Sequence, residues 1–234
     1  MTTYVLVHGA WHGGWCWVRV ADRLRAAGHT VFTPTLSGLS DRSHLLAPTV
    51  SLQTHIKDVA NLIAWEELTD VVLVGHSYGG MVITGAADLV ADRIKTLVFV
   101  DAFTPQHGQA AFDLRAPEAN ALTLQKAKAG GGWRIAPTPA EAFMVNPADR
   151  AWVDAKCTDL PIGCFSEKLH LSGAVDRIAD RVYVRAGAYP NPTFDKALAA
   201  ARADARFKAH VVDCGHDIMV DKPEELSAIL LESA

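Results

Sequence analysis

Residues 71–80 read Val-Val-Leu-Val-Gly-His-Ser-Tyr-Gly-Gly, and the architecture of the chain can be worked out from this stretch. The four apolar residues predict a buried strand, and the apolar run at 81–90 predicts a helix directly after the glycines. A serine at so sharp a strand-to-helix turn is forced toward positive φ, which raises its Oγ above the sheet. Gly75 and Gly79 let the backbone approach closely on either side of Ser77. This context is that of a nucleophile elbow and predicts a catalytic Ser77; the alternative is a glycine-rich turn that merely holds a serine.

Strands and helices alternate along most of the chain. Short apolar runs predict strands at 4–7, 30–32, 71–74, 96–100, 182–185 and 208–212. Apolar residues at helical spacing predict helices over 15–27 and 52–65, and Pro223 opens a last helix. Strands buried on both faces and separated by helices favour a parallel sheet with right-handed crossovers. We therefore expect one α/β domain over residues 1–234, with a six-stranded, mainly parallel sheet flanked by helices.

The alternation stops after Phe103 and resumes near Asp180. The intervening segment has no clear sheet strand, yet it is rich in aromatic and leucine side chains. A disordered linker would be more polar, and so long a stretch without strands in a compact domain is typical of an insertion. We expect a helical cap over about 104–180.

The composition excludes several classes of protein. Half of the 234 residues are hydrophobic, and the net charge of −4 comes without acidic or basic blocks, so nucleic acid and anionic membranes are not expected partners. No apolar stretch approaches about 18 residues, which predicts neither a membrane span nor a signal peptide. The four cysteines are scattered without a C-x-x-C pair, so we expect no metal site or disulfide framework and a cytoplasmic protein.

A serine hydroxyl needs a base that accepts its proton, and histidine suits this task. His216 lies in Asp-Cys-Gly-His-Asp at 213–217, directly after the last expected strand. A loop at the carboxyl end of that strand faces the same crevice as the elbow. We therefore predict that His216 is the catalytic base.

An acyl-transfer reaction also needs donors that face the developing oxyanion. The backbone N–H of Tyr78 lies in the first turn of the expected helix, where it has no intrahelical partner. The second donor is expected in the loop after the first strand, which reads His-Gly-Ala-Trp-His-Gly-Gly at 8–14. By position, Ala10 is the candidate.

These stretches resemble the α/β-hydrolase superfamily. The matching parts are Val5–Trp17, the Ala-Ala-Gly-His at 26–29 and the elbow at 71–81, and they are most similar to the branch of plant methyl esterases, hydroxynitrile lyases and bacterial esterase relatives. The resemblance implies an ester hydrolase without a cofactor, with a Ser–acid–His triad beneath a cap. Lyases of this branch carry a threonine at the position of Gly9 and a lysine at that of Asp217, which counts against a lyase.

The acid of the triad departs from the pattern of the relatives. They carry an aspartate in the loop after the penultimate strand, whereas residues 186–192 here read Ala-Gly-Ala-Tyr-Pro-Asn-Pro. Asp195 follows that loop but lies in the next expected helix. Asp101 ends the strand beside the elbow strand, and a carboxylate there needs a partner such as His216 Nδ1–H. We predict Asp101 as the acid; the alternative is that Asp101 only caps the exit of its strand.

The sequence thus predicts a serine carboxylesterase that cleaves a small apolar or aromatic ester through an acyl-enzyme on Ser77. Trp11, Phe103 and Trp133 are candidates for the substrate pocket, although cap aromatics often serve packing alone. The alternatives are a cofactor-free lyase or oxygenase on the same fold, or a small-molecule binding protein with residual esterase activity. The apolar composition of the cap would also suit a homodimer interface.

Overall fold

Six parallel strands form the central sheet of the computed structural model, which describes residues 1–234. Across the sheet they are ordered β2 (Thr30–Phe32), β1 (Thr3–Val7), β3 (Val71–His76), β4 (Ile94–Val100), β7 (Asp180–Ala186) and β8 (Phe207–Val212). Every neighbouring pair is parallel. The expected sheet is confirmed, and each expected strand lies within an observed one.

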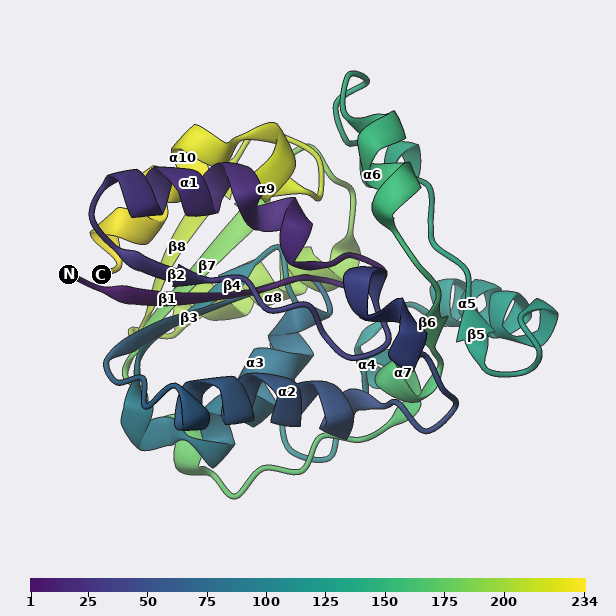
Figure 1. Ribbon diagram of the computed structural model, residues 1–234, viewed down its shortest axis with the longest axis horizontal. Helices are drawn as coiled ribbons and strands as arrows, with labels where there is room; N and C mark the ends of the chain where they lie inside the picture. The colour runs from purple at the N-terminus through teal and green to yellow at the C-terminus, as the bar shows by residue number, and fades with distance from the viewer.

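Helices cover both faces of this sheet. Figure 1 shows α1 (Val18–Ala26) and α10 (Pro223–Glu232) on one face and α2 (Leu52–Trp65) and α3 (Gly79–Leu89) on the other. α8 (Pro192–Ala203) packs against β7 and β8. The expected helix at 52–65 is α2, and its start is capped because Thr54 Oγ1 accepts a hydrogen bond from the Ser51 N–H at 3.3 Å. The helix expected at 15–27 is a 3-10 turn over Gly14–Trp17 followed by α1.

The sheet is the centre of a continuous apolar core. All residues of β3 are buried, as the apolar run at 71–74 predicts for a strand covered on both faces. The core joins strand side chains to the inward faces of the helices and to aromatic residues of the insertion. Each fully buried Val or Leu side chain contributes about 1.5–3 kcal/mol, so the elbow strand is held firmly in its register.

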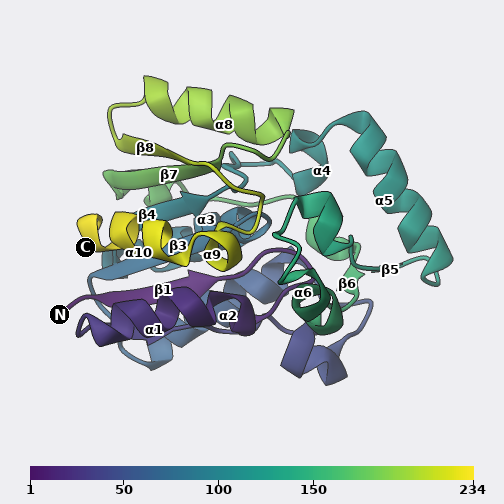
Figure 2. The same ribbon diagram turned by 90° about the horizontal axis from the view of Figure 1, so that it is seen from above.

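The insertion after β4 lies beyond the carboxyl ends of the strands, away from the two termini (Figures 1 and 2). It holds α4 (Ala111–Leu114), α5 (Pro117–Ala129), α6 (Arg150–Lys156), α7 (Gly163–Ser166) and an antiparallel pair of β5 (Arg134–Ile135) and β6 (Leu160–Pro161). A helical cap in this place was expected from the sequence. The remaining short elements are α9 (Ile218–Asp221) and 3-10 turns at Ser40–Leu45, Ala91–Arg93, Ala140–Phe143 and Ala174–Arg177.

No helix of this fold has the length and apolar character needed to cross a lipid bilayer.

Candidate active site

Ser77 occupies a strained turn between β3 and α3. Its φ is +54°, in the left-handed region that non-glycine residues seldom adopt. The turn is held because the Ser77 N–H donates to Val100 O at 3.2 Å and Ser77 O accepts from the Phe103 N–H at 3.2 Å. A Cβ on Gly75 would lie 2.7 Å from the carbonyl oxygen of Gly79, so this turn requires the glycine. Ser77 is half-buried between two buried neighbours, which leaves its side chain accessible.

His216 and Asp101 form a buried pair at the carboxyl ends of the strands. His216 Nδ1 lies 2.6 Å from Asp101 Oδ2, although 115 residues separate the two in the chain. The His216 ring stacks on Phe194, with ring centroids 5.4 Å apart. The backbone N–H of His216 donates to Phe143 O at 2.9 Å. No hydrogen bond joins His216 to Ser77 in the structure; such contacts are often long before a substrate is bound.

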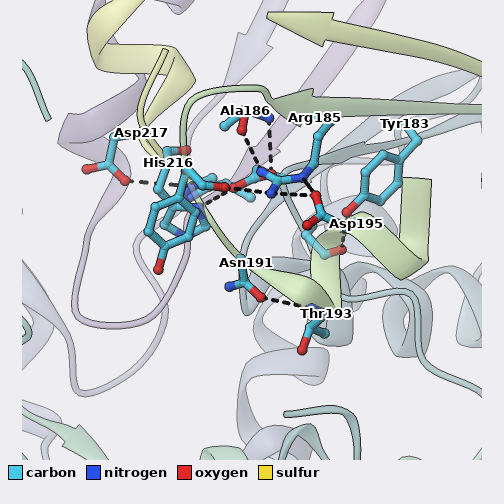
Figure 3. A network of polar contacts seen from close by, with 12 residues as sticks. Tyr183, Arg185, Ala186, Asn191, Thr193, Asp195, His216 and Asp217 are labelled. Carbon is cyan, nitrogen blue, oxygen red and sulfur yellow. Dashed lines mark hydrogen bonds and ion pairs between the residues drawn. The ribbon is translucent and has the colours of Figure 1, made fainter. Parts of the chain in front are cut away.

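Asp101 is itself held from the side away from the histidine. Arg185 Nη1 donates to Asp101 Oδ1 at 2.7 Å, and the Ala186 N–H donates to the same oxygen at 3.1 Å. The Arg185 guanidinium also contacts Asp195 Oδ1 at 2.8 Å, as Figure 3 shows. Asp195 therefore pairs with the arginine and not with His216, and its side chain is 64% exposed, whereas Asp101 is fully buried.

The two expected oxyanion donors come from two different loops at the elbow. Ala10 follows β1 and Tyr78 follows the serine, and neither backbone N–H donates a hydrogen bond within the chain. The loop that carries Ala10 presses on the elbow, since a Cβ on Gly9 would lie 2.9 Å from Ser77 Cβ. Both N–H groups are thus free to bind an oxygen near Ser77.

A second buried carboxylate–histidine pair braces this loop. Both ring nitrogens of His12 face acceptors: Nδ1 lies 2.8 Å from Ala10 O, and Nε2 lies 3.0 Å from Asp217 Oδ2. Because these oxygens accept, His12 is an imidazolium and Asp217 a carboxylate. Burial alone would raise the pKa of Asp217, but the charge and hydrogen bond of His12 outweigh burial and hold this pKa well below its usual range. The ion pair ties the Ala10 peptide to the residue that follows His216.

The one group of ligand-type side chains close enough to hold a metal ion is His76, His216 and Asp217, whose atoms lie within 4.8 Å of one another. Each is already engaged. His76 Nε2 contacts the carbonyl oxygen of His216 at 3.1 Å, His216 Nδ1 contacts Asp101, and Asp217 contacts His12. These contacts form a polar network in which His76 Nδ1 and Asp217 Oδ1 are left without a hydrogen-bond partner.

Ser77 and His216 line one cavity of about 340 Å³ beneath the insertion. Trp11 and Phe103, both expected at a substrate pocket, lie in its wall together with Ala10. Trp133 is not among its lining residues. It follows two glycines at positive φ, and its ring lies 5.5 Å from the Arg134 guanidinium.

Sequence reasoning missed several residues of this site. Arg185 is a charged residue inside the apolar run Val182–Ala186, and a buried cation there was a signal that a carboxylate partner lies nearby. Arg115, between α4 and α5, and Lys126, in the last turn of α5, also reach the cavity wall. Nothing local in the sequence distinguishes these two from the solvated charges of an ordinary helix.

The model of the alpha/beta hydrolase family matches residues 4–229. The chain belongs to this family. A carbendazim hydrolyzing esterase from a Nocardioides strain is 42% identical over 241 residues, which cover 97% of each chain. Methylesterase 7 of Arabidopsis thaliana is 36% identical over 104 residues, which cover 44% of this chain and 40% of that protein.

A solved structure of this family is similar over the whole length of the chain. It is an extracellular alpha/beta-hydrolase from a Paenibacillus species, described as sharing structural and functional homology with tobacco salicylic acid binding protein 2. It superimposes with a TM-score of 0.89 at 26% identity, covering 100% of this chain and 99% of that one. The expected resemblance to plant methyl esterases and bacterial esterases is confirmed, as is the enzyme class of carboxylic ester hydrolases.

Proposed function

We propose that this chain is a serine carboxylesterase that cleaves a small ester through an acyl-enzyme on Ser77. The observation that carries the proposal is the buried Asp101–His216 contact of 2.6 Å at the cavity that Ser77 also lines. The strained elbow and the two unpaired N–H groups supply the remaining parts. The esterase and methylesterase names of the relatives support the same reaction.

The protonation state of His216 follows from its neighbour. A carboxylate accepts hydrogen bonds, so Nδ1 facing Asp101 carries the proton and Nε2 is the free base. Nε2 takes the proton of Ser77 Oγ as this oxygen attacks the ester carbonyl carbon. Asp101 then faces an imidazolium, which its charge stabilises.

The tetrahedral intermediate carries its negative charge on the former carbonyl oxygen. The N–H groups of Ala10 and Tyr78 would hold this oxyanion, and one such donor is typically worth roughly 2.7–4 kcal/mol. Collapse breaks the ester C–O bond, and His216 gives its proton to the leaving alkoxide. A water molecule, deprotonated by His216, then attacks the acyl-enzyme and releases the acid.

A lyase fits the site less well. A Cβ on Gly9 would lie 2.9 Å from both Ser77 Cβ and His76 Nδ1, so the threonine of the lyases has no room in this backbone. Asp217 stands where lyases carry a lysine, and it is buried against His12 instead of facing the cavity.

Burst kinetics with p-nitrophenyl acetate test the proposal. We expect p-nitrophenolate release of at least one equivalent from the wild type and none from Ser77→Ala, since only the serine can form the acyl-enzyme. Ser43→Ala, at an exposed serine outside the cavity, is the matched control and should behave as the wild type. Equal release from folded wild type and Ser77→Ala would refute the assignment.

A further inference from the structure

The cavity above Ser77 has an unbalanced charge. Its wall contains the cations Arg115 and Lys126 but no aspartate or glutamate. Neither cation forms an ion pair in the chain, whereas Arg185, which contacts Asp101, pairs with two carboxylates. The charge of Asp101 does not compensate them, because it is shared between His216 and Arg185.

Arg115 is held in place without a counterion. Its Nη2 donates to Thr123 Oγ1 at 3.0 Å and to Ala119 O at 3.2 Å, and its Cζ lies 4.9 Å from the Phe165 ring centroid. Its Nη1 is buried and donates to no acceptor. A buried donor without a partner costs about 1–3 kcal/mol, more when the group is charged. Burial also lowers the pKa of Arg115, with no carboxylate opposing the effect.

Lys126 lies near Arg115 in the cavity wall, close to Trp11 in the loop that also carries Ala10. Its Nζ donates to Thr138 Oγ1 at 3.0 Å and lies 5.9 Å from the Trp11 ring centroid. Burial lowers its pKa, and the charge of Arg115 lowers it further, so the two cations destabilise each other. A negative group bound by both cations would offset their repulsion. It would also accept the hydrogen bond that Arg115 Nη1 lacks.

We propose that Arg115 and Lys126 bind a carboxylate carried by the substrate, so that the ester cleaved at Ser77 is a monoester of a dicarboxylic acid. This inference rests on the proposed function and narrows its substrate class. It revises the sequence-based expectation of an uncharged ester: the aromatic wall receives the body of the substrate, and the two cations receive its anionic end.

Monomethyl esters of dicarboxylic acids from succinate to suberate test the proposal. Each is compared with the methyl ester of the monocarboxylic acid of equal carbon number, by methanol release. We expect the wild type to prefer the anionic ester in kcat/KM by about tenfold or more at the chain length that spans the cavity, the effect of one hydrogen bond to a charged group. Arg115→Gln and Lys126→Gln should each reduce this ratio toward one.

Arg134→Gln is the matched control, because this cap arginine is exposed and lies outside the cavity. It should keep the wild-type ratio. Neutral esters cleaved as fast as anionic ones at every length would refute the carboxylate site. So would a preference that survives both cavity variants.

Calorimetric binding of the same monoesters to Ser77→Ala separates this inference from the proposed function, since it needs no turnover. Binding that Arg115→Gln weakens, in a protein whose wild type shows no serine-dependent hydrolysis, would support the carboxylate site and refute the esterase. Serine-dependent hydrolysis of neutral esters alone, without binding of the anionic ones, would refute the carboxylate site and keep the esterase.

Discussion

At the residue scale, two aspartates are candidates for the acid of the triad. Both contact Arg185, but their environments differ. The guanidinium lies between them, so Asp101 is fixed by a buried cation on one side and contacts His216 on the other. Asp195 contacts only the arginine and is mostly exposed. An exposed ion pair of this kind contributes about 0–1 kcal/mol to stability. The carboxylate that contacts His216 is therefore the buried one.

Asp101→Asn should lower kcat for p-nitrophenyl acetate by roughly 10⁴-fold, because an amide N–H facing Nδ1 stabilises the wrong tautomer of His216. Asp195→Asn is the matched control and should leave kcat nearly unchanged. Steady-state kinetics on the two variants check this, with circular dichroism to verify folding. A large loss for Asp195→Asn and a small one for Asp101→Asn would reverse the assignment.

At the scale of elements, α3 begins where two other loops of the chain come together. The first turn of the helix lies against the loops that follow β1 and β4. A Cβ on Gly80 would lie 2.1 Å from the carbonyl oxygen of Phe103, and one on Gly79 would lie 2.9 Å from that of His8. The start of α3 thus lies in close contact with the loop that carries Ala10 and with the loop that carries Phe103.

Gly80→Ala should lower the free energy of unfolding by about 3 kcal/mol, the upper part of the usual range for overpacking, because the contact is with backbone that cannot rotate away. The same shift of α3 should lower kcat. Gly108→Ala, at a half-buried glycine with open space where a Cβ would lie and φ of +80°, should cost only about 1 kcal/mol. Urea unfolding checks both variants; equal losses would contradict the close approach of α3.

At the scale of the whole molecule, several buried histidines affect the dependence of stability on pH. Burial lowers the pKa of His8 to about 3 and also lowers the pKa values of His55 and His76. These groups bind protons in the unfolded chain, below about pH 6.5, that they do not bind when folded. The pKa of His12 shifts in the opposite direction. Burial lowers it, but the charge and hydrogen bond of Asp217 outweigh burial and raise it.

The free energy of unfolding should therefore fall as the pH drops below about 6.5. A depressed folded pKa contributes stability above the unfolded pKa and loses it on acidification, by about 1.4 kcal/mol per pH unit for a group such as His8 that stays neutral when folded. His12 adds no slope there, because it is protonated in both states. Urea unfolding from pH 5 to 7.5 measures the slope. His8→Gln should make it shallower, and stability that is constant between pH 5 and 6.5 would contradict the assignment.

The amino-acid sequence alone determined the alternating strands, the parallel sheet and the elbow at Ser77, and it predicted His216 as the base. These follow from local patterns: apolar runs, helical periodicity, and a turn whose sterics require glycines next to the serine. It also led to Asp101, by the rule that a carboxylate ending an apolar strand needs a partner. Each of these inferences needs only neighbours in the chain or the usual order of strands.

Only the tertiary structure decided which distant side chains meet. The Asp101–Arg185 and His12–Asp217 pairs join residues 84 and 205 positions apart, and no local pattern encodes such contacts. The same holds for the cap, in which Arg115 and Lys126 line the cavity and Trp133 does not. Its short helices are oriented by packing against the rest of the molecule, so helical periodicity could not tell which of their side chains face Ser77.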